Sequence, residues 1–377
     1  MPNPEQDGRR VLIVQEHLPH YRVPFFEQLH CLLGERGINL NLAYSLRSTS
    51  TLLPGTLPWA HTVPTIRFGG LVYQNVRASA PKAELVIVPQ EVKYISLYFL
   101  FAHRATRKMK VAFWGHGRNM QARNANSWAE KVKRFLSKRV DWWFAYNERS
   151  AAVVRQLGFP EERITLVQNA IDTRSIIEAR NTLSQKLVES TKSSLGLEST
   201  NVAIYTGGLY EEKRIPFLLQ AASKIRAKLP DFHLIIIGGG PQKDLVAQAA
   251  RNNAWIHYLG PKNDMEKLPY WAISKVSLMP GLVGLGVLDS FALGVPLIAT
   301  AYPYHSPEIE YLRDGVNGII VNDWESSDAY ANAVVHLLQN DRERESMASE
   351  GRKAAEFYTI ENMAENFTQG ILAALRS

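Results

Sequence analysis

The chain has 377 residues, which suits two domains of ordinary size better than a single core. Its 46% hydrophobic and 21% charged residues exclude a disordered chain. Cys31 is the only cysteine, so an internal disulfide is excluded and a reducing compartment fits best. No apolar run approaches the roughly 18 residues of a membrane-spanning helix, and the polar start lacks a secretory signal. We therefore expect a cytoplasmic protein.

Charge is distributed unevenly along the chain. Residues 1–180 contain 25 Lys and Arg against 14 Asp and Glu. Between Arg104 and Arg139, eleven basic residues accompany a single acid. Such a patch attracts an anionic membrane, which predicts peripheral docking at the inner face of the plasma membrane, with a solvated helix face as the alternative. No nucleic-acid partner is expected, because the aromatic residues of the patch form no stacking pattern.

The first half of the chain alternates short apolar runs with amphipathic ones. Expected strands are 10–16, 39–45, 83–89, 110–115, 141–146 and 164–168. Expected helices are 23–33, 94–107, 127–138 and 148–157. Because the strands are apolar throughout, they predict a parallel sheet with helices on both faces.

After a polar stretch, residues 173–200, the alternation begins again. That stretch is rich in Ser, Thr, Glu and Lys and is helix-prone, without a convincing strand, and we interpret it as a connector. Strands are then expected at 202–206, 233–237, 255–259, 276–279, 296–300 and 318–321, and helices at 215–229, 243–252, 327–339, 342–357 and 361–375. The predicted fold class is α/β, with two Rossmann-like doubly wound domains, 1–172 and 201–360, facing each other across a ligand cleft.

A glycine-rich segment follows the expected strand that ends at Met279. Gly281, Gly284 and Gly286 allow a ligand to approach the backbone closely, and an apolar helix comes next. The start of that helix presents unpaired amides and the positive end of the helix dipole, which suit a diphosphate. A tight structural turn is an equally weighted alternative for the glycines alone.

Two further glycine loops follow strands of the second half. In Tyr205–Arg214, Lys213 begins a helix, where its ammonium group can neutralise a phosphate charge; a solvated lysine is the commoner alternative. Gly238–Gly240 lack the complete dinucleotide fingerprint, so a structural turn is favoured. No acidic residue stands about 20 positions later on a strand end, which disfavours a dinucleotide-dependent oxidoreductase.

Together these stretches resemble the family-4 retaining glycosyltransferases, which have the two-domain GT-B fold. The matching stretches, in order, are VQNAID (Val167–Asp172), YTGGLYEEK (Tyr205–Lys213), IIIGGGP (Ile235–Pro241), YLGP (Tyr258–Pro261), GLGVLDSFALGVPLIAT (Gly284–Thr300) and PEIEYLRDGVNGIIV (Pro307–Val321). HYRVPFFEQL (His20–Leu29) and WGHG (Trp114–Gly117) resemble the family more loosely. The resemblance implies an N-terminal acceptor-binding domain, a C-terminal nucleotide-sugar domain, and a last helix, 361–377, that packs back on the first domain.

The family carries two glutamates separated by seven residues across the glycine loop. The second, which grips the nucleotide ribose, corresponds to Asp289, and the first corresponds to Gly281. The family's phosphate-binding arginine falls near Gly208 or Leu209 and is also absent, whereas its lysine is Lys213. The resemblance implies these donor-binding residues: Gly208, Lys213, Gly281, Leu282, Val283, Gly284, Leu285, Gly286 and Asp289.

Three residues of the first domain are candidates for the reaction site. His116 lies between two glycines at the carboxyl end of the strand 110–115. The resemblance places it near the transferred sugar, so His116 and Asp289 are the expected catalytic residues. Arg22 and Asn169 are expected to contact acceptor or donor, with a helix-start arginine as the alternative for Arg22.

No metal site is expected in this chain. The sequence contains no Asp-X-Asp pair, and no Cys/His cluster has zinc spacing. Loop amides, the helix dipole and Lys213 would then stabilise the leaving diphosphate. No cofactor is expected either, since the UDP- or GDP-linked sugar is a substrate.

The predicted function is that of a metal-independent glycosyltransferase. It moves a hexosyl or related group from a nucleotide-sugar to a hydroxyl of a saccharide or lipid-linked acceptor. The resemblance implies retention of anomeric configuration and a role in bacterial surface polysaccharide biosynthesis. The alternative is a nucleotide-sugar-binding subunit or regulator that has lost catalysis, motivated by the missing glutamate and arginine.

Overall fold

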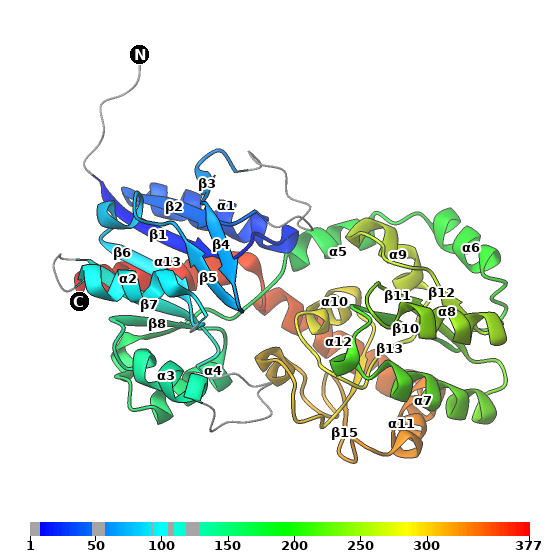
Figure 1. The fold of residues 1–377 in the computed structure, drawn as a ribbon. Helices are drawn as coiled ribbons and strands as arrows, with labels where there is room; N and C mark the ends of the chain where they lie inside the picture. The colour runs from blue at the N-terminus through cyan, green and yellow to red at the C-terminus, as the bar shows by residue number, and fades with distance from the viewer. Residues whose placement is uncertain (1–7, 47–56, 92, 105–108, 118–127) are drawn as a thin grey trace. The chain divides into compact units, whose positions relative to one another are not determined.

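The computed structural model describes residues 8–46, 57–91, 93–104, 109–117 and 128–377. The chain divides into two compact units (Figure 1). The first unit combines Met1–Ile171 with Ile360–Ser377, and the second is Asp172–Thr359. The C-terminal segment, red in Figure 1, is therefore part of the same unit as the N-terminal half.

The first unit is built on a seven-stranded, entirely parallel sheet in the order β3-β2-β1-β6-β7-β8-β9. Its strands are β1 (Arg9–Gln15), β2 (Ile38–Tyr44), β3 (Ala60–Thr62), β6 (Leu85–Pro89), β7 (Lys110–Gly115), β8 (Trp142–Ala145) and β9 (Ile164–Leu166). Its helices are α1 (Val23–Gly34), α2 (Ile95–Arg104), α3 (Trp128–Ser137), α4 (Glu148–Gln156) and α13 (Ile360–Arg376). Apolar central strands with helices on both faces form the layers expected from the sequence.

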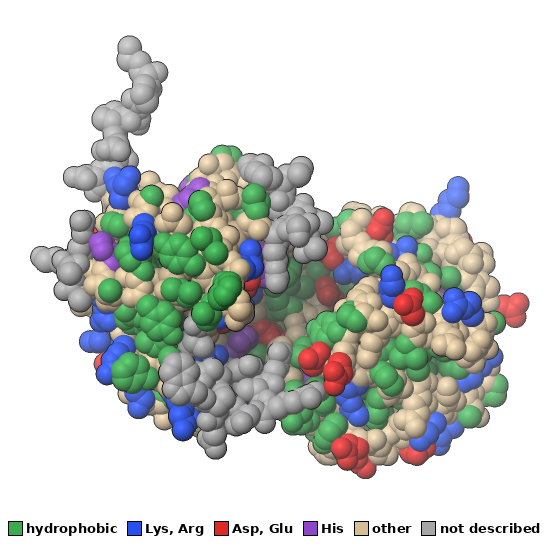
Figure 2. All heavy atoms as spheres, viewed as in Figure 1, with side chains coloured by type: hydrophobic (Ala, Val, Ile, Leu, Met, Phe, Trp, Pro, Cys, Tyr) green, Lys and Arg blue, Asp and Glu red, His purple; other side chains and the backbone are tan. Residues whose placement is uncertain are grey.

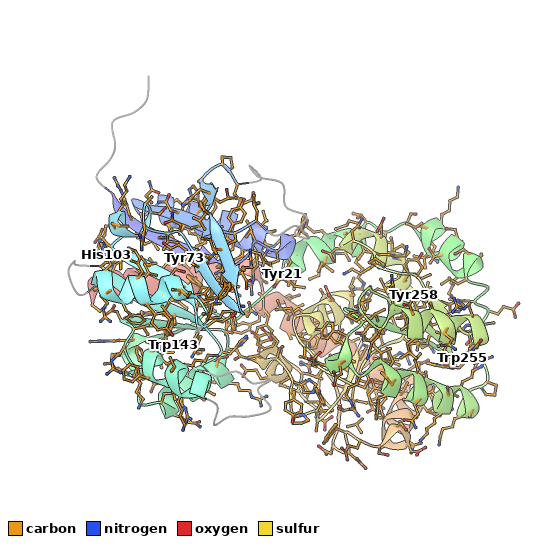
Figure 3. The ribbon with its side chains drawn as sticks, viewed as in Figure 1. Tyr21, Tyr73, His103, Trp143, Trp255 and Tyr258 are labelled. Atoms are coloured by element: carbon orange, nitrogen blue, oxygen red, sulfur yellow. The ribbon has the colours of Figure 1, made fainter. Side chains whose placement is uncertain are left out.

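Apolar residues on each face of this sheet hold the layers together. On one face, Leu12, Phe113 and Trp143 join one buried cluster with residues of α2 and α4; Trp143 is labelled inside the unit in Figure 3. On the other face, α1 packs against α13. Phe367 of α13 is fully buried and stacks on Phe144 of β8, with ring centroids 4.3 Å apart.

A short hairpin in the first unit was not predicted. It consists of β4 (Thr65–Phe68) and β5 (Leu71–Gln74), which pair antiparallel. Gly69 and Gly70 turn the chain with φ of 54° and 81°, the left-handed conformation that a tight hairpin requires. The residues of β4 are partly or fully exposed, and so are those of β3, which was not predicted either. Both strands lack the buried pattern by which the predicted strands were identified.

The second unit is built on a six-stranded parallel sheet in the order β12-β11-β10-β13-β14-β15. Its strands are β10 (Val202–Thr206), β11 (His233–Ile237), β12 (Ile256–Tyr258), β13 (Val276–Met279), β14 (Leu297–Thr300) and β15 (Gly318–Val321). Its helices are α5 (Thr173–Asn181), α6 (Gln185–Ser194), α7 (Ile215–Lys228), α8 (Lys243–Asn252), α9 (Asp264–Ala272), α10 (Gly286–Leu293), α11 (Ser327–Gln339) and α12 (Asp341–Phe357). Trp255 and Tyr258, labelled in Figure 3, lie at the β12 edge.

The expected connector, 173–200, is instead part of the second unit. It forms α5 and α6, and both helices contact α9. Thr173 is buried, and its hydroxyl donates to the carbonyl of Ala355 at 3.1 Å. The polar composition hid a narrow apolar stripe that packs on neighbouring helices, a contact that only tertiary structure reveals.

Helix α9 was also missed, although its start is encoded. Asn263 accepts from the amide of Glu266, and Glu266 returns a bond to the amide of Asn263, which is a capping box. Pro269 lies inside the helix, where proline is unfavourable.

Among the described residues, no helix has both the length and the apolar character needed to cross a bilayer.

Candidate functional site

The second sheet reverses its strand order between β10 and β13. Successive strands extend outward on either side of this pair, as in a doubly wound fold. The loops that follow the two strands, 207–213 and 280–285, therefore leave the sheet side by side. Ligands of open α/β sheets bind at this switch point, outside the carboxyl ends of the strands.

Hydrogen bonds join these two loops to each other. The amide of Leu282 donates to the carbonyl of Glu212 at 2.8 Å. The ammonium group of Lys213 donates to the carbonyl of Leu282 at 2.6 Å. The next amide, of Val283, donates to Nδ1 of His305 at 2.9 Å. The amides of Leu282 and Val283, expected to contact the donor, are thus already engaged within the protein.

The next three amides of the loop have no such partners. Gly284, Leu285 and Gly286 are half-buried, and their N–H groups make no backbone hydrogen bond within the described part of the chain. They stand at the start of α10, where the helix dipole favours negative charge. This arrangement matches an anion-binding helix start.

The third glycine loop, Gly238–Gly240, supports the first two. A Cβ at Gly238 would collide with the carbonyl of Gly207, and one at Gly240 would lie 2.5 Å from the carbonyl oxygen of Leu209. The amide of Leu209 donates to the carbonyl of Gly239 at 2.8 Å. These glycines permit close backbone packing, which is the structural role favoured from the sequence.

Lys213 is a desolvated cation beside the free amides. Burial lowers its pKa to about 8. Its ammonium group also lies 5.6 Å from the centroid of the Tyr210 ring. A dianionic ligand nearby would favour the charged lysine and return its pKa toward the ordinary value.

Asp289 lies in the first turn of α10, partly exposed rather than in the core. Burial of the carboxyl raises its pKa to about 6, and nearby Lys267 of α9 opposes that rise. Lys267 is itself bound to Asp264 at 2.7 Å. The carboxylate is therefore ionised at neutral pH but incompletely solvated, a state that favours hydrogen bonds from hydroxyl groups.

Two substitutions relative to the family pattern have local structural counterparts. Gly281 is buried, and a Cβ there would collide with the carbonyl of Glu212 and lie 2.5 Å from the carbonyl carbon of Lys213. A glutamate does not fit this backbone. At Gly208, a Cβ would collide with the ring of Tyr210, so this tyrosine occupies the space where the family's arginine would begin.

In the first unit, His116 follows the carboxyl end of β7. It is half-buried, and its ring lies 4.3 Å from that of Tyr146, which follows β8. Within the described residues its Nδ1 is buried and has no hydrogen-bond partner. Burial, with Lys133 and Arg22 nearby, lowers the pKa of His116 to about 3, so the ring is neutral.

Arg22 and Asn169, both expected to contact a substrate, contact each other. The guanidinium of Arg22 donates to Oδ1 of Asn169 at 2.5 Å and lies 5.3 Å from the centroid of a Trp114 ring. Arg22 is 7% exposed, so its side chain is packed rather than free in solvent. The structure thus brings Arg22, His116 and Asn169 to the carboxyl ends of β1, β7 and β9.

Some residues at the two loops of the switch point had no sequence prediction. His305 binds the Val283 amide and, through Nε2, the carbonyl of Thr300 at 2.8 Å. Arg214, with φ of 56°, donates to the carbonyls of Pro280 and Trp324 at 3.2 and 2.7 Å. The capping box would have predicted helix α9, which carries Lys267. No local sequence pattern indicates a role for His305 or Arg214.

The basic patch lies partly outside the described residues. Lys131, Arg134 and Lys138 are exposed on and after α3, and Arg139 lies over the Phe135 ring at 3.5 Å. Lys and Arg side chains gather along the lower edge of the first unit in Figure 2. Residues 105–108 and 118–127 belong to the patch but lie outside the described part.

In the part that is described, no cluster of three His, Cys, Asp or Glu side chains suits a metal.

A family model described as glycosyl transferases group 1 matches residues 200–340, which include both loops of the switch point. Over this segment the chain is similar to the group 1 glycosyltransferases. The group 1 segment contains β10 to β15, the switch point, Lys213 and Asp289. The family resemblance predicted from the glycine loops is thereby confirmed for this segment.

Curated relatives match a similar part of the chain. A putative glycosyltransferase, EpsD of Bacillus subtilis, is 27% identical over 45% of this chain and 46% of its own length. The D-inositol 3-phosphate glycosyltransferase of Corynebacterium urealyticum is 27% identical over 49% of this chain and 46% of its own length. The chain thus spans about half the length of these relatives.

Solved structures match nearly the whole chain in fold. HepE of Anabaena, crystallised with UDP, superposes with a TM-score of 0.73 over 97% of this chain and 99% of that chain, at 14% identity. A glycosyltransferase from Rickettsia africae gives a TM-score of 0.72 over 99% of this chain and 100% of its own, at 13% identity. The fold is GT-B, with two Rossmann-like units, as the sequence predicted.

Proposed function

We propose that this protein is a glycosyltransferase that moves a sugar from a nucleoside diphosphate donor to an acceptor hydroxyl. The observation that carries the proposal is the row of free amides at Gly284, Leu285 and Gly286, beside Lys213 at the switch point. Three donors at a helix start and one desolvated cation match the oxygens of a diphosphate. The match of residues 200–340 to the family model of group 1 glycosyl transferases supports the same assignment.

Asp289 is the proposed ribose-binding group. Its carboxylate, one helical turn into α10, accepts hydrogen bonds from the ribose hydroxyls. The diphosphate then lies over the amides that precede it in the chain. Along the chain, the amides proposed to bind the diphosphate directly precede the carboxylate proposed to bind the ribose. In a nucleotide-sugar the diphosphate is likewise joined directly to the ribose.

The chemistry breaks the bond between the anomeric carbon and the diphosphate oxygen and forms one to the acceptor oxygen. The acceptor proton passes to the leaving diphosphate, and the anomeric configuration is retained. Negative charge that develops on the diphosphate is stabilised by the loop amides, the α10 dipole and Lys213, without a metal ion. His116, neutral at physiological pH, orients a sugar hydroxyl by hydrogen bonding.

The acceptor is proposed to be a saccharide or lipid-linked saccharide bound by the first unit. Two relatives support a lipid setting, an alpha-monoglucosyldiacylglycerol synthase and a phosphatidyl-myo-inositol mannosyltransferase. The exposed cations Lys131, Arg134 and Lys138 would bring the protein to anionic lipid. A role in surface polysaccharide synthesis at the inner face of the plasma membrane follows from this proposal.

Nucleotide binding is the first test. Calorimetry with UDP, GDP and ADP, in chelator, is carried out on the wild type, Asp289→Ala and Asp244→Ala. Asp244 is the matched control, because it also lies in the first turn of a helix after a glycine loop but is exposed. One nucleotide should bind, with affinity reduced about tenfold or more in Asp289→Ala alone, as expected for the loss of a charged hydrogen bond.

Transfer is tested with the sugar conjugates of the nucleotide that binds. Release of the diphosphate in the presence of acceptor, undiminished by chelator, would support the reaction, and NMR of the new anomeric proton would check retention. Binding without any release would favour the non-catalytic subunit instead. Failure of all three nucleotides to bind would refute the donor site itself.

A further inference from the structure

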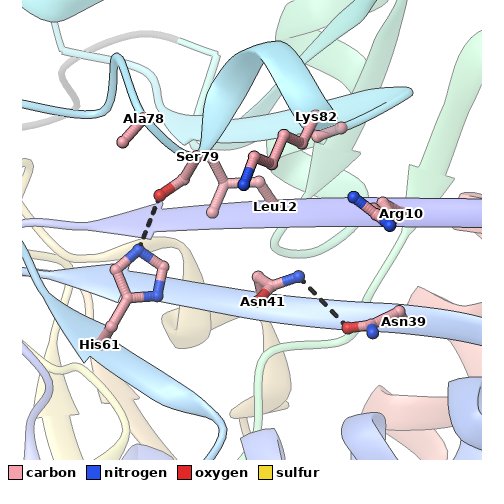
Figure 4. Close-up of a pocket in the computed structure, with 9 residues that line it drawn as sticks. Arg10, Leu12, Asn39, Asn41, His61, Ala78, Ser79 and Lys82 are labelled. Carbon is pink, nitrogen blue, oxygen red and sulfur yellow. Dashed lines mark hydrogen bonds between the residues drawn. The ribbon is translucent and has the colours of Figure 1, made fainter. Parts of the chain in front are cut away.

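A concave site lies on the first unit, away from the carboxyl ends of its strands. The pocket has a volume of about 570 Å³, within the roughly 300–1,000 Å³ typical of small-molecule sites. β1, β2 and β3 form its floor, and residues 78–83, which precede β6, form its roof (Figure 4). None of the residues assigned to donor or acceptor lines it.

Polar side chains on this floor are unusual for their place in the sheet. β1 is an inner strand, paired with β2 on one side and β6 on the other. Inner parallel strands are usually apolar on both faces, and Leu12 on this face is buried. Arg10 shares the face with Leu12, directly opposite Asn39, while Asn41 lies opposite Leu12. The face thus changes from apolar to polar toward the amino ends of β1 and β2.

Two cations and no acid line the pocket. Arg10 is half-buried on the floor, and Lys82 extends from the roof toward the floor strands in Figure 4. Among the described residues, neither side chain has an ion-pair partner. By contrast Arg9, on the opposite face of β1, pairs with Glu84 at 3.1 Å. The pocket therefore holds two positive charges that nothing in the described chain neutralises.

Neutral hydrogen-bonding groups stand beside the two cations. Nε2 of His61 lies 2.9 Å from the hydroxyl of Ser79, and Nδ2 of Asn41 donates to Oδ1 of Asn39 at 3.2 Å (Figure 4). Within the described part of the chain, these contacts leave Nδ2 of Asn39, Oδ1 of Asn41 and Nδ1 of His61 available to a ligand. Donors and acceptors fixed in this way suit the hydroxyl groups of a sugar.

We propose that this pocket binds a saccharide that carries an oxyanion, either a carboxylate or a phosphate. Arg10 and Lys82 bind the anion through charge-assisted hydrogen bonds. Asn39, Asn41 and the His61–Ser79 pair bind the sugar hydroxyls. Arg10 lies five residues before the carboxyl end of β1. At roughly 3.3 Å per residue, the distance between them along the strand is about 16 Å. The site is thus separate from the carboxyl ends of the strands and does not depend on transferase activity.

Calorimetry on the full chain tests the pocket with three probes: glucose 6-phosphate, glucuronate and glucose. At least one charged probe should bind about tenfold or more tightly than glucose, as charged hydrogen bonds allow. The better of the two identifies phosphate or carboxylate as the preferred anion. Excess UDP should leave the affinity unchanged, and displacement by UDP would overturn the proposal by assigning the probe to the donor site.

Three variants complete the test. Arg10→Gln and Lys82→Gln should each weaken the charged probe about tenfold and leave glucose unaffected. Arg9→Gln, which removes the same charge from the opposite face, should change neither. Lys82 is exposed, so its substitution keeps the fold even if Arg10→Gln does not, and melting temperatures verify this. Equal affinity in all variants, or no binding of either charged probe at about 10 mM, would overturn the proposal.

Discussion

Asp289 illustrates how a residue suited to binding weakens the fold that carries it. Its carboxyl has a pKa raised to about 6 by burial, against an ordinary value of 3.8. A raised folded-state pKa means that ionisation of Asp289 opposes folding. The resulting destabilisation of the fold is fully present above about pH 6. It disappears below about pH 4, where Asp289 is protonated in both the folded and the unfolded state. Binding residues often carry such a cost, because ligand groups complete their solvation.

Asp289→Asn should therefore raise the melting temperature near pH 7.5 and leave it unchanged below about pH 4. The same change should weaken nucleotide binding about tenfold, since the charged acceptor is lost. Wild-type affinity should also decline as pH falls through about 6, whereas the variant should show no such decline. Thermal melts and calorimetry at several pH values measure both effects. A variant that is less stable near pH 7.5 would contradict the desolvation argument.

The buried residue Gly281 allows the two loops of the switch point to pack closely. Gly281→Ala places a methyl group against the backbone of Glu212 and Lys213, which cannot move as a side chain would. We expect a loss of roughly 1–3 kcal/mol in unfolding free energy, as for other overpacked sites. Nucleotide affinity should fall as well, because the shift displaces the carbonyl that holds Lys213.

Urea denaturation and calorimetry measure the Gly281 effects. Gly34→Ala, at the end of α1 where no atom lies within 4 Å of the new Cβ, is the matched control. If Gly281→Ala is as stable as this control and binds nucleotide normally, the proposed close packing of the two loops is wrong. For the same reason, Gly281→Glu is not expected to restore the family's donor contact.

At the scale of elements, α13 shows how a distant segment completes a core. Phe367 is fully buried among Phe25, Trp114 and Phe144, with ring centroids 4.3 to 5.6 Å away. A Cβ at Gly370 would collide with Thr165 of β9, so the helix lies close against the sheet. The last 18 residues of the chain, Ile360–Ser377, thus stabilise a unit that otherwise ends at Ile171.

Phe367→Ala should reduce the stability of the first unit by about 3–5 kcal/mol, the usual cost of removing a buried ring. Phe68→Ala is the control, because that residue belongs to the same unit but is 83% exposed, and its loss should cost about 0.5 kcal/mol or less. Calorimetric unfolding separates the transitions of the two units. At 25 °C nucleotide affinity should be unchanged in both variants, because the proposed donor site lies in the second unit. Equal losses for both variants would contradict this account of α13.

At the scale of the molecule, charge is the property that the sequence distributes most unevenly. The basic surface around α3 predicts binding to vesicles of anionic phospholipid, weakening as salt rises because screening shortens the range of the attraction. Replacing Lys131, Arg134 and Lys138 with Glu should abolish binding in a sedimentation assay. The matched control replaces three exposed lysines of the second unit, Lys186, Lys228 and Lys243. Equal binding by both triple variants would argue against docking through α3.

The sequence alone determined the two Rossmann-like units, the central strands and the loops at the switch point. These features depend on local signals: apolar runs of strand length, glycines after strands, and the apolar helix after Gly286. The strand Val202–Thr206 and the helix Ser327–Gln339 were predicted with the bounds that the structure gives. Elements without a buried stripe, such as β4, and elements with a contrary residue, such as Pro269 in α9, were missed.

Only the tertiary structure decided which amides of the glycine loop are free and which side chains surround them. Leu282 and Val283 differ from Gly284 and Leu285 because Glu212 and His305, distant in sequence, accept their hydrogen bonds. The exclusion of a side chain at Gly281 likewise follows from the packing of two loops about 70 residues apart. The sequence specifies each loop through local backbone preferences, whereas the site arises from contacts between loops that parallel sheet topology brings together.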